Sequence, residues 1–239
     1  EWSATVLAPG GTPESVAINE ALGIDAMSDD LGSSSLLSRA EHLFWYPAEV
    51  DVSIRPGWFW HASEDSLVKD VEKLADIYLS SVGRNAVLLL NVPPDNRGLI
   101  TDHDIKSLQG LKAWIDDLYS TDMLNGARPY GQGASNLIDG DNSTSWSPHR
   151  KRVASFVPAI AATFNTAMLQ EDISRGQRVE KFVIEALSGE RWDTIARGTT
   201  IGYRRLLRFP EVKADEIRLT IVSSRATPHI STFALYNAR

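Results

Sequence analysis

Hydrophobic positions in the first half of the chain change their spacing from one segment to the next. From Leu67 they recur every three or four residues, which predicts an amphipathic helix with Ser63 as its N-cap and Gly83 as its end. An apolar run over 86–92 follows and predicts a strand buried on both faces. Thr101 then opens a second predicted helix. Its inner face would be Ile105, Leu108, Leu111, Ile115 and Leu118.

A further strand is predicted at 50–54, before the first helix. The resulting order of strand, helix, strand, helix is typical of a parallel α/β fold. In such folds functional groups gather at the carboxyl ends of the strands, where this pattern puts the rings after Gly57 and the amide of Asn91. Two such units leave strand edges unpaired, so we expect further strands from an upstream segment or a separate chain.

The second half of the chain has a different pattern. Beyond about residue 124 glycines punctuate a polar stretch, and strand-like segments follow without helical spacing. The segments are 179–187, 192–196, 204–209, 216–222 and 230–236. We predict two domains, an α/β domain over 1–123 and an antiparallel β-sandwich over 124–239.

The segment 45–61 concentrates the side chains that bind sugars. Rings stack on the apolar face of a pyranose, while carboxylates and cationic donors bind its hydroxyls or attack its glycosidic bond. We expect Glu49 to be a catalytic or substrate-binding carboxylate, with an ion pair to Arg55 as the structural alternative. The predicted substrate contacts are Trp45, Arg55, Trp58, Phe59 and His61.

Composition narrows the range of partners. The chain has 239 residues, a formal net charge of −7 and 43% hydrophobic residues, which is typical of a globular protein that does not bind nucleic acid. Its apolar runs are too short to cross a membrane. It contains no cysteine, which leaves the cellular location open, with a periplasmic or extracellular location favoured.

Several motifs in the first half resemble a known enzyme family. These are the stretches 47–59, 81–85 and 88–95, with Gly98-Leu99-Ile100 after them. Together they resemble the C-terminal part of the catalytic domain of family 29 glycoside hydrolases, the α-L-fucosidases. The stretch 134–146 resembles the opening of a discoidin-like, factor 5/8 C-type, galactose-binding domain.

The resemblance implies a fold and an activity. The fold would be the last part of a (β/α)8 TIM-like barrel followed by a β-sandwich of the jelly-roll type. The activity would be retaining hydrolysis of terminal α-L-fucose from fucosylated glycans, which needs a nucleophile and an acid/base about 5 Å apart. No residue of this chain matches the family's nucleophilic aspartate. The alternative is therefore a protein that binds fucose or another glycan without cleaving it, and a weaker one is an accessory domain.

The resemblance leaves two candidates for the acid/base. Glu1 matches a Glu-Trp/Tyr motif that some members use, and Glu49 matches the glutamate that others use ahead of a Gly-aromatic motif. Trp58 or Phe59 would contact the methyl group of fucose. No cofactor is expected for catalysis.

The turn after the domain boundary has two interpretations. Asp139, Asp141 and Thr144 could hold a structural calcium ion, as related sandwich domains do. An ordinary Asp-Gly turn is the equal alternative. The five histidines show no metal-ligand spacing, so we predict no catalytic metal.

Overall fold

The computed structural model of the chain describes residues 2–6, 38, 43–161 and 163–238. Near the start, β1 (Trp2–Val6) pairs antiparallel with β2 (Leu43–Pro47). Sequence analysis did not predict this pair. Within the described residues no helix is both long and apolar enough to span a bilayer.

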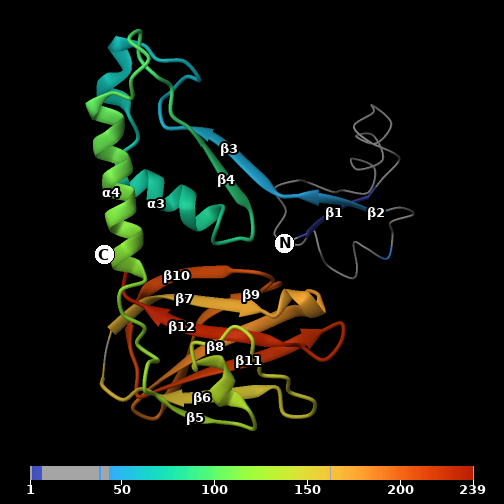
Figure 1. Cartoon of the computed structure of the whole chain (residues 1–239). Coiled ribbons are helices and arrows are strands. Elements are labelled where there is room, and N and C mark those ends of the chain that lie inside the picture. The colour runs from blue at the N-terminus through green and yellow to red at the C-terminus, as the bar shows by residue number, and fades with distance from the viewer. Residues whose placement is uncertain (1, 7–37, 39–42, 162, 239) are drawn as a thin grey trace.

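The next elements form the predicted α/β unit. Strand β3 (Glu49–Ser53) leads through a 3₁₀ turn, η1 (Ala62–Leu67), to α3 (Val71–Ser80), β4 (Val87–Asn91) and α4 (Asp102–Leu118). Strands β3 and β4 are parallel, and both helices lie on one side of them (Figure 1). The order of these elements is the predicted one.

The start of the first helix differs from the prediction. Ser63 lies within η1, and α3 begins after Asp70, whose side chain accepts a hydrogen bond from the Lys73 backbone N–H at 2.9 Å. This bond satisfies one of the free N–H groups of the first turn, which is why the helix starts there. The cap predicted at Thr101 is confirmed, since its hydroxyl accepts from the Asp104 N–H.

The burial of β4 also differs from the prediction. One face packs on the helices in a small core that contains Ile54, Leu74 and Leu111. On the other face Val87 and Leu89 are 56% and 50% exposed. The prediction of burial on both faces is therefore wrong for the described residues, because none of their elements covers this second face.

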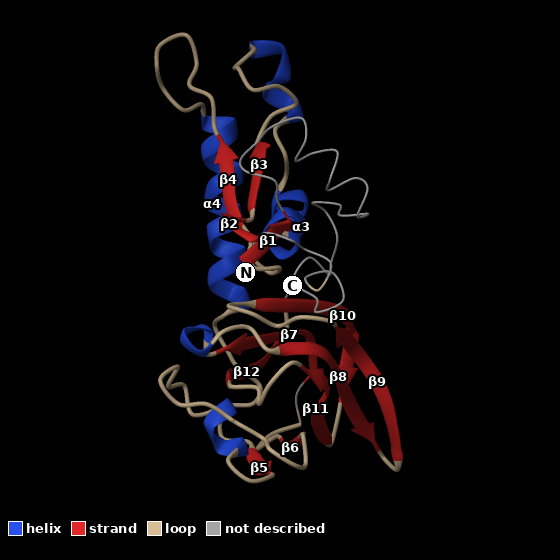
Figure 2. Cartoon of the chain, turned by 90° about the vertical axis from the view of Figure 1, so that its right-hand side faces the viewer, coloured by secondary structure: helices blue, strands red, loops and turns tan. Residues whose placement is uncertain are grey.

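The second half consists of two antiparallel sheets (Figure 2). The three-stranded sheet has the order β10 (Arg205–Lys213), β7 (Thr163–Glu171), β12 (Ile230–Tyr236). The five-stranded sheet has the order β5 (Arg128–Tyr130), β6 (Val153–Val157), β11 (Glu216–Ser224), β8 (Val179–Ser188), β9 (Arg191–Gly198). Two short 3₁₀ turns, η2 (Ala134–Leu137) and η3 (Ile173–Arg175), lie between strands. This arrangement is consistent with the predicted β-sandwich.

Side chains from both sheets fill a common core. Phe156 on β6 and Phe233 on β12 meet edge to face, with ring centroids 5.5 Å apart. Trp146, before β6, is 1% exposed and belongs to the same core. Alternation along β6 and β12 turns the two phenylalanine rings inward, and burial of the apolar side chains of this core stabilises the second half.

The helices rest on the three-stranded sheet. Leu118 of α4 packs with Leu206 and Tyr236, and the Leu206 N–H donates to the carbonyl of Gly83 at 2.8 Å. A β-carbon on Gly83 would lie 2.3 Å from the Leu79 carbonyl oxygen and 2.9 Å from the β-carbon of Leu206, so only glycine allows this close approach.

Asn85 joins the two halves by hydrogen bonds. Its backbone has φ of 69°, a conformation that asparagine tolerates better than most residues. Its side-chain amide donates to the Ile201 carbonyl at 2.9 Å and accepts from the Arg204 N–H at 2.6 Å. The turn after α3 is thus fixed to the loop before β10.

The tyrosines of this interface predict loss of stability in alkali. Burial raises the pKa of Tyr119, and the hydrogen bond to Tyr78 adds to this effect; burial also raises the pKa of Tyr236 to about 12. In the unfolded chain both ionise near pH 10. Stability is therefore complete below about pH 10 and falls as the pH rises toward 12, because ionisation favours the unfolded state.

Chemical unfolding measured between about pH 9 and pH 12 tests this. We expect Tyr236→Phe to reduce the loss of unfolding free energy with pH. Tyr203→Phe, at an exposed position, is the control. An unchanged pH dependence in Tyr236→Phe would contradict the assignment.

Candidate functional site

A loop rich in aromatic residues leaves the carboxyl end of β3 and is held by side chains of both strands. The Ser53 hydroxyl donates to the Gly57 carbonyl at 2.7 Å. The amide of Asn91, at the end of β4, donates to the Ser53 hydroxyl at 3.1 Å and to the Trp58 carbonyl at 2.9 Å. Because these bonds fix the backbone on both sides of the turn, the rings that follow have a defined position.

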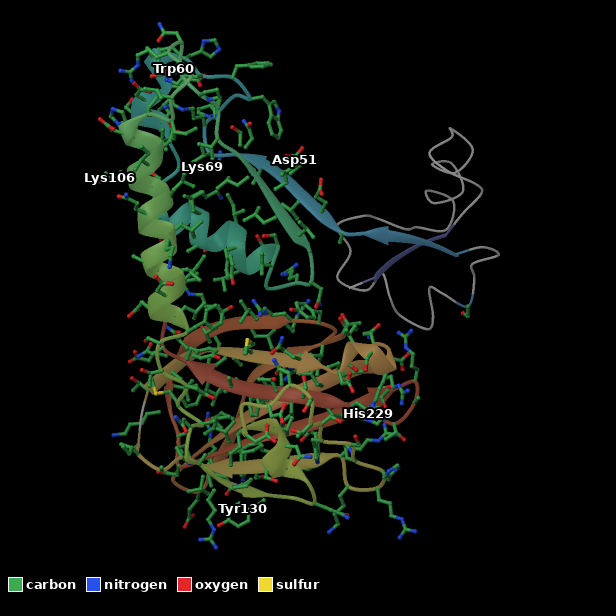
Figure 3. The ribbon with its side chains drawn as sticks, viewed as in Figure 1. Asp51, Trp60, Lys69, Lys106, Tyr130 and His229 are labelled. Atoms are coloured by element: carbon green, nitrogen blue, oxygen red, sulfur yellow. The ribbon has the colours of Figure 1, made fainter. Side chains whose placement is uncertain are left out.

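Lys69 supports the same loop from the helix side. Its ammonium donates to the carbonyls of Ser53 and Arg55 at 2.6 and 3.2 Å, and it lies between β3 and the helices (Figure 3). Burial lowers the pKa of Lys69, and the charge of Lys73 lowers it further. The Lys69 ammonium thus satisfies the backbone carbonyls of Ser53 and Arg55 at the carboxyl end of β3.

Arg55 is not a substrate contact in this structure. Its side chain is fully buried, and it donates to both oxygens of the buried Asp104 carboxylate, at 3.0 Å to Oδ1 and 2.7 Å to Oδ2 in the shortest bonds. It also donates to Asp65, Thr101 and the His61 carbonyl. The predicted role in sugar binding is therefore corrected: Arg55 is a positioning residue that ties the loop to the start of α4. The alternative ion pair with Glu49 is also wrong.

The loop presents its rings to solvent. Trp58 is 50% exposed and Phe59 is 78% exposed, although both are large apolar side chains. His61 is exposed as well, while Trp60 is half-buried. Exposed rings on a fixed backbone are typical of a surface that stacks against a ligand. The position of Trp58, Phe59 and His61 is thus compatible with the predicted role.

Two polar atoms beside the loop have no hydrogen-bond partner among the described residues. They are the indole N–H of Trp60 and one carboxylate oxygen of Glu64, and both are buried. The other Glu64 oxygen lies 3.9 Å from where a β-carbon on Gly57 would be. Glu64 was not among the predicted site residues, because a glutamate in the predicted first turn of a helix is explained by its favourable interaction with the helix dipole.

Glu49 lies on the exposed face of β3. It is the first residue of the strand and neighbours Val87, while Asp51 is on the same face beside Leu89 (Figure 3). Four residue steps along the strand lead from Glu49 to Ser53, which is about 13 Å. The structure therefore places Glu49 toward the amino end of β3, away from the rings at its carboxyl end. Asp51, which was not among the predicted site residues, lies nearer to that end.

Two other predicted residues cannot be placed. Glu1 lies outside the described residues. Trp45 is on β2, but its side chain is outside the described part. Their roles stay predictions.

The predicted calcium turn satisfies its own carboxylates. Asp139 accepts hydrogen bonds from the Asp141 N–H at 2.9 Å and from the Thr144 hydroxyl at 2.7 Å, and Asp141 accepts from the Ser143 N–H at 2.8 Å. The described residues contain no cluster of three or more histidine or acidic side chains suited to a metal. The geometry favours the Asp-Gly turn, and the calcium site stays a prediction.

Comparisons with known proteins identify the class of the first half. Residues 8–118 match the model of a family described as alpha-L-fucosidase. The chain is therefore related to glycoside hydrolases that act on fucosides, and the family resemblance inferred from the motifs is confirmed.

Particular relatives extend the match into the second half. The chain is 41% identical over 206 residues to a candidate alpha-L-fucosidase 1 of Oryza sativa subsp. japonica, across 80% of this chain and 40% of that protein. It is 37% identical over 209 residues to alpha-L-fucosidase 1 of Arabidopsis thaliana, across 80% of this chain and 41% of the relative.

A solved structure shows that the similarity includes the fold. The crystal structure of a candidate alpha-L-fucosidase from Bacteroides ovatus superimposes with a TM-score of 0.83 at 44% identity, over 100% of this chain and 39% of that one. The chain thus spans about two fifths of the length of these relatives.

Proposed function

We propose that the chain is part of a retaining α-L-fucosidase that removes terminal α-L-fucose from glycans. The observation that supports this most directly is the fixed loop with exposed Trp58 and Phe59 at the carboxyl end of β3, in a chain related to fucosidases. The deoxy sugar has a methyl group and an apolar ring face that such rings could cover.

The α/β unit would be the last part of a (β/α)8 barrel completed by an upstream segment or a separate chain. On the face of β4 away from the helices, Val87 and Leu89 are exposed. On α4 a hollow of about 200 Å³ is lined by Leu108, Leu111 and Ile115, with Lys112 and Asp116 at its side. The exposed apolar side chains of β4 and the hollow on α4 suit packing against further strands and helices.

The proposed chemistry needs two carboxylates. One attacks the anomeric carbon of fucose and forms a covalent ester while the other gives a proton to the departing glycosidic oxygen. The second then takes a proton from water, whose oxygen attacks the ester and releases fucose. The nucleophile would come from outside this chain, and Glu1 and Glu49 are the candidates for the acid/base. Glu64 is a further carboxylate near the rings.

For the second half we propose a discoidin-like, galactose-binding fold of the jelly-roll type. Its eight strands in two antiparallel sheets support this, as does the buried Trp146 after the Asp-Gly turn. Whether a calcium ion occupies that turn is a separate part of the proposal.

Hydrolysis of an aryl α-L-fucoside by the native polypeptide that contains this chain tests the function. We expect chromophore release, and we expect Trp58→Ala to raise KM about tenfold, since it removes a ring contact with the sugar. Tyr203→Ala, which removes an equally exposed ring from the sandwich, should leave KM unchanged. Binding of fucose without turnover would favour the glycan-binding alternative. The absence of both binding and turnover would contradict the enzyme proposal and the glycan-binding alternative alike.

A further inference from the structure

Three loops meet at the end of the sandwich where His229 lies (Figure 3). The Ser147 hydroxyl and the His229 Nδ1 atom are 2.6 Å apart, which joins the loop before β6 to the loop before β12. The Arg178 guanidinium donates to the Thr227 carbonyl at 2.8 Å, and the Arg225 N–H donates to the Arg178 carbonyl at 2.9 Å. These bonds hold the loop before β8 against the same end.

The three loops carry a concentration of cations that we term the basic end. Its members are Arg150, Lys151, Arg152, Arg175, Arg178 and Arg225. Two of the six are ion-paired, Arg175 to Asp172 at 3.0 Å and Arg225 to Glu180 at 4.0 Å. The other four cations of the basic end form no ion pair within the described part of the chain, whose full sequence has a net charge of −7.

The four remaining cations are available to a ligand. Among the described residues, Arg150, Lys151 and Arg152 form no ion pair, and Arg150 and Lys151 are exposed. The Arg178 guanidinium donates to the carbonyls of Arg175 and Thr227, and the Arg178 backbone N–H donates to the Glu171 carboxylate. Burial lowers the pKa of His229, and the charges of Arg178 and Arg175 lower it further, as expected in a positive field.

We propose that the basic end binds an anionic glycan through its sulfate or carboxylate groups. Guanidinium groups form paired hydrogen bonds with such oxyanions, and several cations spread over three adjoining loops suit a polymer better than a single small ion. The negative charge of the rest of the chain repels a polyanion, so contact is confined to this end. The ligand would therefore approach along the loops.

The structure favours a glycan over a nucleic acid. Single-stranded nucleic acids are held by rings that stack on the bases. In the loops 141–152, 172–178 and 225–229, the indole or phenyl ring is that of Trp146, which is buried. The choice of a glycan also rests on the proposed function, because a fucosidase acts at the ends of such chains.

Affinity of the 239-residue chain for three immobilised polymers tests the proposal, in parallel with a single-stranded DNA. The polymers are heparin, polygalacturonate and a neutral galactan. We expect binding to the sulfated polymer, the polyuronate or both, with no binding to the galactan. We expect the affinity to fall roughly tenfold between about 0.05 and about 0.3 M salt, because exposed charges are screened.

Matched variants locate the site. The triple variant R150Q/K151Q/R152Q should lose about tenfold in affinity. The control R191Q/R197Q/K213Q removes the same charge from exposed positions on β9 and β10 and should bind as before. Thermal unfolding of both variants checks that each is folded.

Three outcomes would overturn the proposal. They are equal loss in both variants, binding to the neutral galactan, and preference for DNA over both anionic glycans. This test measures binding to polymers and does not depend on hydrolysis of aryl fucosides. Failure of the proposed enzyme activity and failure of the basic end are therefore separate results.

Discussion

Replacing Arg55 by methionine is expected to lower the free energy of unfolding by about 3 to 5 kcal/mol. The change removes the partner of Asp104, and both side chains are fully buried. A buried carboxylate left without its cation is far more costly than the pair itself. The loop that carries Trp58 and Phe59 should also lose its fixed position, because Arg55 ties Asp65 and the His61 carbonyl to α4.

Urea unfolding of the chain measures this effect. Lys112→Met breaks the ion pair with Asp116 on the exposed side of α4 and should change the stability little, since surface pairs contribute little. The double variant R55M/D104L tests the cause, because it removes both charges and should recover part of the lost stability. A loss no larger in Arg55→Met than in Lys112→Met would show that the buried pair does not hold the loop.

Replacing the acid/base glutamate by glutamine is expected to lower kcat/KM for a phenyl α-L-fucoside by roughly 10² to 10⁴. The loss should be much smaller for a dinitrophenyl fucoside, whose leaving group needs no proton. Glu1→Gln and Glu49→Gln are compared in the native polypeptide, and each serves as the control for the other.

The two variants give distinguishable results. One should show the dependence on the leaving group, while the other should lose the same activity on both substrates or none. If neither shows it, the acid/base lies elsewhere and both assignments fail. Glu64→Gln is then the next variant, because its carboxylate lies beside Gly57.

Much of the fold follows from periodicity. The helix 102–118 and the strand 230–236 were predicted nearly to the residue, since a capping threonine marks the first and an apolar run the second. Strand β7 was missed. It is buried along most of its length, yet it contains Asn165, Thr166 and Gln170. These polar residues interrupt the apolar pattern by which a central strand is recognised in a sequence.

The predictions that failed depend on long-range partners. Arg55 lies in a segment that we predicted to bind sugar, and only the structure shows that Asp104, 49 residues later, neutralises it. The exposure of Val87 and Leu89 likewise depends on what covers β4, which its own sequence does not reveal. The local pattern thus located the ring-bearing loop, but it did not separate the residues that support the loop from those that face solvent.

The contact between α4 and the three-stranded sheet affects how the chain could be divided. A cut after residue 123 would follow the change in sequence pattern. It would, however, separate Leu118 from its packing partners Leu206 and Tyr236. It would also remove the hydrogen bonds of the Asn85 side chain to the Ile201 carbonyl and the Arg204 N–H. Each fragment would expose an apolar surface that the other now covers. The sandwich therefore supports the helices, and the isolated halves are expected to aggregate more readily than the intact chain.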